Sequence, residues 1–499
     1  YMCVHKQRSE KWMRERADQL KGQVRRMFVP SKSMSVADTL SLVDTLERLG
    51  IDNHFHKEID AALSRINTEK DFDSYNDLHT VALRFYVFDK FKDSTGNFKM
   101  DLTTDPRGLL SLYNAAHMAV PGETALDDAI AFARGHLELV IGKLRSPMAE
   151  QVSRALEIPR PRFARRLEAM HYITEYEQED AHDTAMLELA KLDFNIARSF
   201  HLKELMSLSL WWRGLYEDVN LTYTRSRIVE LYFYANGLFH EEEHSRARII
   251  LAKSLTLIDD TYDTQATLED ARILNEAIQR WDESMVTTLP EYLRVLYIKL
   301  LETINEIEDL LEPCEMYRMP HLIEMLKLLS GYYFKEAEWF HRNYMPSFKE
   351  TPAVFIVALA GLGKRVTKEA FDWAVNIPDM VLGSAETGRF LNDIACYKRE
   401  EERRKSKLDP SSSFECYIEE HGVTMENAMV TFDMMVEHAW RRINLECMEV
   451  DRGILPTARV VVDMTRLIKL WYFQGRDAYT FNVSLKETLI SLFLKDFLA

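Results

Sequence analysis

Apolar residues recur at three- and four-residue spacing along almost the whole chain, and this spacing limits the folds that the chain can adopt. Residues 38–50 show the pattern and end on Gly50, a residue that favours the left-handed conformation found after many helices. The same spacing is repeated in four further segments: residues 126–144, 226–238, 292–311 and 425–445. No series of alternating strands and no strand–helix–strand rhythm is evident. We therefore predict an all-α protein.

Glycine and proline are scarce, which favours long helices with few turns. The 499 residues include 17 Gly and 14 Pro, roughly half the usual share. A chain of this length can form two or three domains with a large core. The polar stretch 177–183 lacks helical periodicity. We therefore expect a domain boundary near it, with an N-terminal domain over residues 1–182 and a C-terminal domain over residues 183–499.

Charge and cysteine usage narrow the class of protein. The net charge of −16 disfavours nonspecific binding to nucleic acid or to an anionic membrane. The five cysteines form no CxxC pair, which is typical of a reduced intracellular protein. The longest apolar stretch, residues 352–363, is too short to span a bilayer. We expect a cytoplasmic protein without a membrane span, and any targeting peptide would precede Tyr1.

An acidic run, DDTYD, follows the apolar segment 249–258 and contains Asp259, Asp260 and Asp263. On a helix Asp259 and Asp263 share one face, with Asp260 beside them. Carboxylates near a core are costly unless a cation lies between them. Mg²⁺ suits such oxygen ligands and usually takes its remaining ligands from water and substrate phosphate. A lone DDxxD is more often a solvated helix end than a metal site, so its interpretation depends on the rest of the chain.

A second polar face lies about 130 residues later. Asn392, Cys396 and Glu400 are spaced four residues apart and would share one side of a helix. Asn392 and Glu400 offer oxygen ligands for another hard cation. Three arginines could face the two acidic sites: Arg225, Arg227 and Arg389. Metal ions together with bidentate guanidinium groups are suited to binding a polyphosphate.

Two other motifs are weaker. Residues 240–244 fit HExxH, which on a helix would place two histidines on one face for zinc, with Glu241 as the base. No third ligand is obvious, and the glutamate-rich setting also fits a solvated connection between helices. Residues 361–365 partly match a phosphate-binding loop, but no strand precedes them. We favour neither site.

The order RxR, DDxxD and (N/D)Dxx(S/T)xxxE resembles the plant class I terpene synthases, most closely the cytosolic sesquiterpene cyclases. Residues 225–227, 259–263 and 392–400 carry these motifs. Supporting stretches extend the resemblance over essentially the whole chain: residues 37–51, 192–195, 277–282 and 477–480. The resemblance implies an N-terminal relict α-barrel without an active site and a catalytic C-terminal α-bundle.

The resemblance also implies a Mg²⁺-dependent carbon–oxygen lyase acting on phosphates. Such an enzyme would ionise farnesyl diphosphate and steer the carbocation to a hydrocarbon or alcohol. Three Mg²⁺ ions are expected, and Mn²⁺ could substitute. Two ions would be held by the first acidic set: Asp259, Asp260 and Asp263. The third would occupy the second set: Asn392, Cys396 and Glu400.

The remaining site residues also follow from the resemblance. The diphosphate would be bound by three arginines: Arg225, Arg227 and Arg389. A carbocation needs a dry pocket with aromatic faces, and four residues match active-site positions: Tyr234, Tyr472, Asp477 and Tyr479. Tyr234 stands where relatives often have Trp, and ordinary core packing is the alternative for it.

The chain departs from the family pattern at several positions. Cys396 replaces a metal-binding hydroxyl, and a thiol is a poor ligand for Mg²⁺. Ser226 replaces the common Asp of the RxR motif, and the segments near Tyr86 and Glu350 look short. The alternatives are a mono- or diterpene synthase on another prenyl diphosphate, or a catalytically impaired helical binding protein. The family expectation is a monomer.

Overall fold

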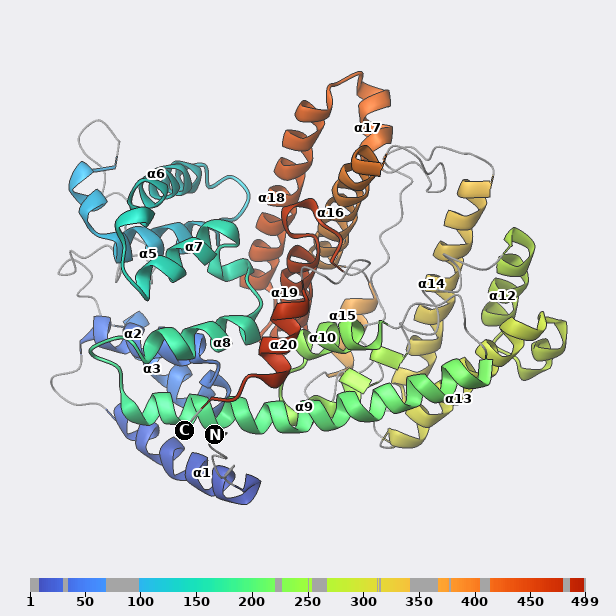
Figure 1. Cartoon of the computed structure of the whole chain (residues 1–499), viewed down its shortest axis with the longest axis horizontal. Helices are drawn as coiled ribbons and strands as arrows, with labels where there is room; N and C mark the ends of the chain where they lie inside the picture. Colours follow the sequence, from blue (N-terminus) through green and yellow to red (C-terminus); the bar gives the residue numbers. More distant parts are fainter. Residues whose placement is uncertain are drawn as a thin grey trace, which may run out of the picture. The chain divides into compact units, whose positions relative to one another are not determined.

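The computed structural model describes the following residues: 9–29, 35–68, 98–219, 227–249, 251–253, 267–311, 313, 316–341, 367–376, 378–403, 413–478 and 485–497. Their regular elements are helices (Figure 1), so the all-α prediction is confirmed. Among these helices, none combines the length and the apolar character needed to cross a bilayer.

The chain divides into two compact units. Unit 1 comprises residues 1–199 and 490–499, and unit 2 comprises residues 200–489. The divisions fall inside helix α9, Thr184–Val219, and helix α20, Lys486–Leu494, so each of these helices supplies residues to both units. The domain boundary expected at residues 182/183 stays a prediction.

Seven α-helices precede α9 in the described part of unit 1: α1 Glu10–Met27, α2 Val36–Leu49, α3 His56–Thr68, α5 Pro106–Ala116, α6 Ala125–Val140, α7 Met148–Glu157 and α8 Arg165–Tyr176. Helix α2 begins with a capping box formed by Ser35 and Asp38. It ends at Gly50, whose φ of 72° is the left-handed conformation. A Cβ there would lie 2.9 Å from Ala169 Cβ of α8, so glycine allows both the turn and the close approach of the two helices.

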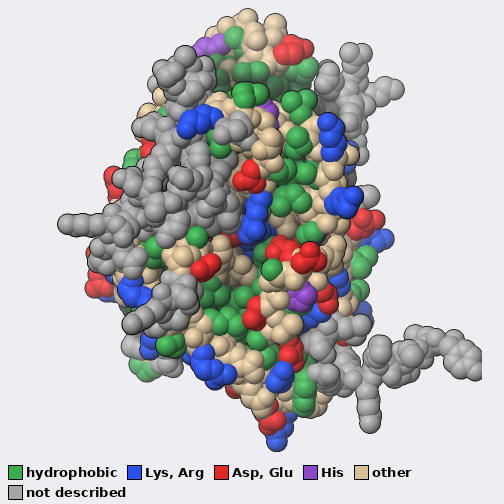
Figure 2. All heavy atoms as spheres, turned by 90° about the vertical axis from the view of Figure 1, so that its left-hand side faces the viewer, with side chains coloured by type: hydrophobic (Ala, Val, Ile, Leu, Met, Phe, Trp, Pro, Cys, Tyr) green, Lys and Arg blue, Asp and Glu red, His purple; other side chains and the backbone are tan. Residues whose placement is uncertain are grey.

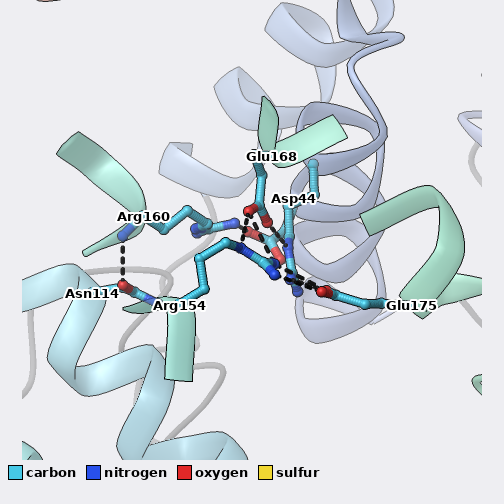
Figure 3. Close-up of polar contacts among 7 residues, drawn as sticks. Asp44, Asn114, Arg154, Arg160, Glu168 and Glu175 are labelled. Atoms are coloured by element: carbon cyan, nitrogen blue, oxygen red, sulfur yellow. Dashed lines mark hydrogen bonds and ion pairs between the residues drawn. The ribbon is translucent and has the colours of Figure 1, made fainter. Parts of the chain in front are cut away.

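Unit 1 contains a charged network between α2, α7, α8 and the 3₁₀ turn Arg160–Arg162 (Figure 3). Its members are three arginines and three acids: Arg48, Arg154, Arg160, Asp44, Glu168 and Glu175. Glu168 accepts from Arg48 at 3.0 Å and from Arg154 at 3.2 Å. Arg154 also donates to Glu175 at 2.6 Å. The charges balance, as buried ions require.

The end of the chain completes unit 1 beside α9. The Asn195 side chain donates to the carbonyl oxygen of Phe497 at 2.6 Å, and its amide oxygen accepts from the Phe497 N–H at 3.1 Å. The Phe497 ring meets the Phe194 ring edge-on, with ring centroids 5.0 Å apart. These hydrogen bonds and this ring contact join residues that are far apart in sequence but belong to one unit.

Nine α-helices lie within the described part of unit 2: α10 Ile228–Leu238, α12 Leu268–Arg280, α13 Glu291–Leu310, α14 Arg318–His341, α15 Lys368–Val375, α16 Asp379–Arg403, α17 Ser413–His421, α18 Met425–Glu449 and α19 Leu455–Trp471. Helix α16 lies against α18 and α19, and α19 also contacts α10 (Figure 1). The periodic segments predicted from the sequence form α6, α10, α13 and α18, within a few residues of the expected ends.

The surface carries charges of both signs. On the face that Figure 2 shows, the described Lys and Arg side chains are interspersed with Asp and Glu side chains, and neither sign gathers into a broad patch. Nucleic-acid binding would use a continuous basic surface, which the described residues of this face do not provide.

Candidate active site

Helix α10 carries two of the predicted site residues. It begins directly after Arg227, its N-cap residue, and includes Tyr234. The two positions are seven residues apart, which places them on the same face of the helix about 10 Å from each other. Arg227 therefore lies at the N-terminal end of the helix face that carries Tyr234.

Tyr234 belongs to a buried aromatic stack. Its ring lies parallel to that of Trp471, with centroids 4.5 Å apart and planes inclined by 22°. Tyr234 is 7% exposed and Trp471 is 9% exposed. Burial raises the pKa of Tyr234 far above its usual range, so its hydroxyl stays protonated at neutral pH. The stack offers aromatic surface to an apolar or cationic group.

Helices α10 and α19 approach each other very closely. A Cβ on Gly237 would lie 2.5 Å from Leu467 Cδ2 of α19. Gly237 thus faces Leu467, whereas Tyr234, earlier in α10, faces Trp471, later in α19. The two helices are therefore antiparallel. Arg227 consequently lies at the end of the bundle where α19 stops.

Helix α16 also packs against α19 and runs parallel to it. Ser384 and Thr465 join the two helices through their hydroxyls at 2.6 Å. One turn further along both helices, a Cβ on Gly388 would lie 3.5 Å from Ile468. Arg389 and Asn392, which follow Gly388, are therefore carried to the same end of the bundle as Arg227.

Arg389 is held by a buried carboxylate one turn away. Its Nε donates to Oδ2 of Asp393 at 3.1 Å, and the Asp393 side chain is only 2% exposed. An ion pair in which the acid is buried orients the guanidinium group. Asn392 precedes Asp393, so a side-chain amide and an oriented cation are neighbours on α16.

The helical spacing predicted for the second polar face is confirmed. Residues Asp379–Arg403 form one α-helix, which places positions 392, 396 and 400 on one side. The side chains of Cys396 and Glu400 lie outside the described part of the structure. The donor types fit a hard cation at Asn392 and Glu400, and they fit it poorly at Cys396.

The chain turns sharply after α19 and brings two more predicted residues to this end. Tyr472 follows the last residue of α19, and Gln474 and Gly475 adopt left-handed φ values of 55° and 69°. The Ala478 N–H donates to the Trp471 carbonyl oxygen at 2.9 Å and closes the turn. Asp477 precedes Ala478, so Tyr472 and Asp477 lie on the loop that caps the Trp471 end of α19.

Five predicted residues lie outside the described part of the chain: Arg225, Asp259, Asp260, Asp263 and Tyr479. Across the described residues, no group of three His, Cys, Asp or Glu side chains that could hold a metal is found. The roles assigned to all of the site residues therefore stay predictions.

Sequence reasoning missed Trp471 and Asp393. Trp471 ends the apolar stripe of α19 that includes Met464 and Leu467, so its burial could have been expected from helical spacing. The ring on which it stacks, that of Tyr234, lies more than 200 residues away in sequence, so the stack itself could not have been expected. The role of Asp393 could have been proposed from its position one turn after Arg389.

The HExxH motif does not lie on an α-helix. Glu242–His244 form a single 3₁₀ turn, and His244 Nδ1 contacts Glu241 Oε2 at 2.8 Å. The backbone oxygen of His240 lies 3.0 Å from His201 Nε2 of α9. The two histidines are thus not placed one helical turn apart, as a zinc-binding helix would place them.

Comparison with known families gives two matches. A model described as "Terpene synthase family, metal binding domain" matches residues 213–442. A second, "Terpene synthase, N-terminal domain", matches residues 2–156.

Individual proteins resemble the chain over nearly its full length. An eudesmanediol synthase of Zea mays is 50% identical, with 100% of this chain and 94% of the relative covered. A tau-cadinol synthase of Zea mays is 41% identical, with coverage of 98% and 93%. Isoprene synthase from grey poplar, Populus x canescens, solved with three Mg²⁺ ions and dimethylallyl-S-thiolodiphosphate, has a TM-score of 0.89 at 28% identity and 98% coverage of both chains.

Proposed function

Because this chain belongs to the terpene synthase family and is an enzyme of that class, we propose that it ionises farnesyl diphosphate and releases a sesquiterpene and diphosphate. The product is a hydrocarbon or an alcohol. The relatives named above as synthases of eudesmanediol and tau-cadinol make sesquiterpene products and support this substrate. The metal-binding domain implies dependence on a divalent metal.

The arginines would bind the diphosphate group of the substrate. Arg227 and Arg389 come to one end of the bundle in unit 2, and Arg225 precedes Arg227 by two residues. Guanidinium groups bind phosphate oxygens bidentately. As the carbon–oxygen bond breaks, its electron pair leaves with the diphosphate, and the arginines stabilise the departing charge. Asp393 keeps Arg389 oriented for this contact.

The metal ligands would be the two acidic sets. Three Mg²⁺ ions, or Mn²⁺ in their place, would neutralise diphosphate charge when bound and so favour bond cleavage. The first set is Asp259, Asp260 and Asp263. The second is Asn392, Cys396 and Glu400.

The aromatic stack would hold the hydrocarbon chain. Ionisation leaves an allylic carbocation, which the faces of Tyr234 and Trp471 can stabilise while burial keeps bulk water away. The cation then loses a proton to give a hydrocarbon, or adds water and loses a proton to give an alcohol. Tyr472, Asp477 and Tyr479 would line the site beside the diphosphate.

One observation carries the proposal: Arg227, Arg389, the amide side chain of Asn392 and a buried aromatic stack converge at one end of α10, α16 and α19. To test it, the protein is incubated with Mg²⁺ and geranyl, farnesyl or geranylgeranyl diphosphate. Released diphosphate is measured and the products are identified by gas chromatography and mass spectrometry. Turnover of farnesyl diphosphate is expected.

Two variants sharpen this test. Arg389→Ala should abolish most turnover, whereas Arg452→Ala, at an exposed position of the same unit, should leave it unchanged. Turnover of only geranyl or geranylgeranyl diphosphate would assign a mono- or diterpene synthase. No diphosphate release from any substrate would indicate a helical binding protein and overturn the proposal.

We also propose that the enzyme is a monomer that acts in the cytoplasm. Light scattering after size-exclusion chromatography should report the mass of one chain. A fluorescent fusion of the natural full-length protein should distribute through the cytoplasm, and accumulation in plastids would contradict this location.

A further inference from the structure

A buried ionic network joins three helices of unit 2 away from the residues assigned to the site. Its centre is Arg248, which is 0% exposed. Arg248 Nε and Nη2 each donate to the Glu204 carboxylate of α9 at 2.8 Å. The Tyr232 hydroxyl of α10 donates to the same carboxylate at 2.7 Å. Glu204 therefore receives hydrogen bonds from two different segments.

Arg248 also fixes the backbone between these segments. Its Nη1 donates to the carbonyl oxygens of Phe239 and, at 2.7 Å, Glu241. The guanidinium carbon lies 5.1 Å from the centroid of the Phe200 ring. Residues 239–241, which connect α10 to the helical residues 245–249 and 251–253, are thus bound from inside the core.

In sequence, two members of the network, Tyr232 and Arg248, lie between Arg227 and the acidic run. Tyr232 is five residues after Arg227 on α10, and Arg248 is eleven residues before Asp259. Burial, together with the nearby Glu204 carboxylate, raises the pKa of Tyr232, so its hydroxyl stays protonated and can donate. A bidentate ion pair with a charge-assisted hydrogen bond is rigid and costly to deform.

We propose that Arg248 is a positioning residue, which with Glu204 and Tyr232 fixes the spacing between α10 and the helical residues 245–249 and 251–253. Arg227, the N-cap residue of α10, can then bind the diphosphate without reorganisation. The inference rests on the proposed function. It also explains the glutamate-rich HExxH segment as a connection whose carbonyl oxygens Arg248 binds.

The test is binding of inorganic diphosphate in the presence of Mg²⁺, measured by calorimetry on the full chain. Glu204→Gln should raise the dissociation constant about tenfold. Tyr232→Phe removes one hydrogen bond without changing the shape and should raise it about threefold. The KM for farnesyl diphosphate should rise in parallel.

Glu168→Gln is the matched control. Glu168 is also a buried acid held by two arginines, but it lies in unit 1. Its replacement should lower the unfolding temperature and leave diphosphate affinity within about twofold. Equal loss of affinity in Glu204→Gln and Glu168→Gln would overturn the inference, because destabilisation alone would then explain both.

Two further outcomes are decisive. If Glu204→Gln does not fold, Tyr232→Phe decides, and unchanged affinity in that variant overturns the inference. If the unaltered protein binds Mg²⁺ and diphosphate but turns over no prenyl diphosphate, the proposed function fails while the binding series still tests Arg248. If it binds no diphosphate, both proposals fail.

Discussion

At Tyr234 the chain has a phenol, where the family that it resembles often has an indole. The ring keeps the aromatic surface, because it lies parallel to Trp471. The hydroxyl adds a neutral polar atom within a buried stack, and its raised pKa keeps it protonated. Such an atom can hold a water molecule beside a carbocation. Small differences at this scale matter, since about 1.4 kcal/mol changes a product ratio tenfold.

Tyr234→Phe should therefore lower the ratio of alcohol to hydrocarbon products. Loss of one hydrogen bond to water is worth about 1 kcal/mol, or roughly fivefold in the ratio. Product ratios from gas chromatography measure the effect. Tyr297→Phe is the control, because the Tyr297 hydroxyl bonds the Ala277 carbonyl oxygen elsewhere in unit 2. An unchanged ratio in Tyr234→Phe would show that the hydroxyl takes no part in water capture.

Cys396→Ser should keep or improve activity when Mg²⁺ is limiting. A hydroxyl is a better ligand than a thiol for a hard cation. The Mg²⁺ concentration giving half-maximal turnover should therefore fall or stay the same. Cys447→Ser on α18 should not change it. A clear loss of activity in Cys396→Ser would count against position 396 as a metal ligand.

At the scale of elements, the site depends on how closely α10 and α19 approach. Gly237 and Leu467 are in contact one turn from the Tyr234–Trp471 stack. Leu467 is 1% exposed, so its side chain has little space into which to move. The helix pair therefore sets the position of the aromatic stack.

Gly237→Ala should destabilise the protein by about 1–3 kcal/mol, because the added methyl group overpacks this contact. Thermal unfolding measures the change. Gly331→Ala on α14 is the matched control. A Cβ there would meet nothing nearer than 3.8 Å, so alanine should be neutral or stabilising. Adding Leu467→Ala should recover part of the loss at Gly237, and no recovery would contradict the contact as the cause.

Much of the element order could be predicted from helical periodicity. Residues 292–311 were expected to be helical, and α13 is Glu291–Leu310. Periodicity reports which face of a helix is buried but not what buries it. The antiparallel pairing of α10 with α19 therefore could not be predicted. The motifs predicted that Arg227, Arg389 and Asn392 belong together, because that information lies in residue type and order, and their roles stay predictions.

At the scale of the whole molecule, the free energy of unfolding should depend on pH because unit 1 contains buried ionisable groups. Burial, aided by the Arg154 charge, lowers the pKa of His171 from 6.5 to about 4. Burial alone would raise the pKa of Glu168, but Arg48, Arg154 and Arg160 outweigh it and lower that pKa. In both groups the unfolded chain binds a proton at higher pH than the folded chain.

The free energy of unfolding should therefore fall as the pH is lowered. The contribution of His171 is fully present above pH 6.5 and is lost toward pH 4. The contribution of Glu168 is lost below its usual pKa of 4.5. Urea unfolding between pH 7 and pH 4 measures this decline. His171→Gln should flatten it between pH 6.5 and 5, whereas His136→Gln on α6 should not, and an equal slope in all three proteins would rule out His171 as the source.

The bonds between Asn195 and Phe497 also set an order of events during synthesis. Their partners are separated by 302 residues. At a synthesis rate of about 5–20 residues per second, the ribosome needs roughly 15–60 s to pass from one to the other. During that interval all of unit 2 is synthesised while Phe194 still lacks the ring that will pack against it. The unit that is begun first is therefore finished last, and until then a nascent chain displays an apolar surface that chaperones can bind.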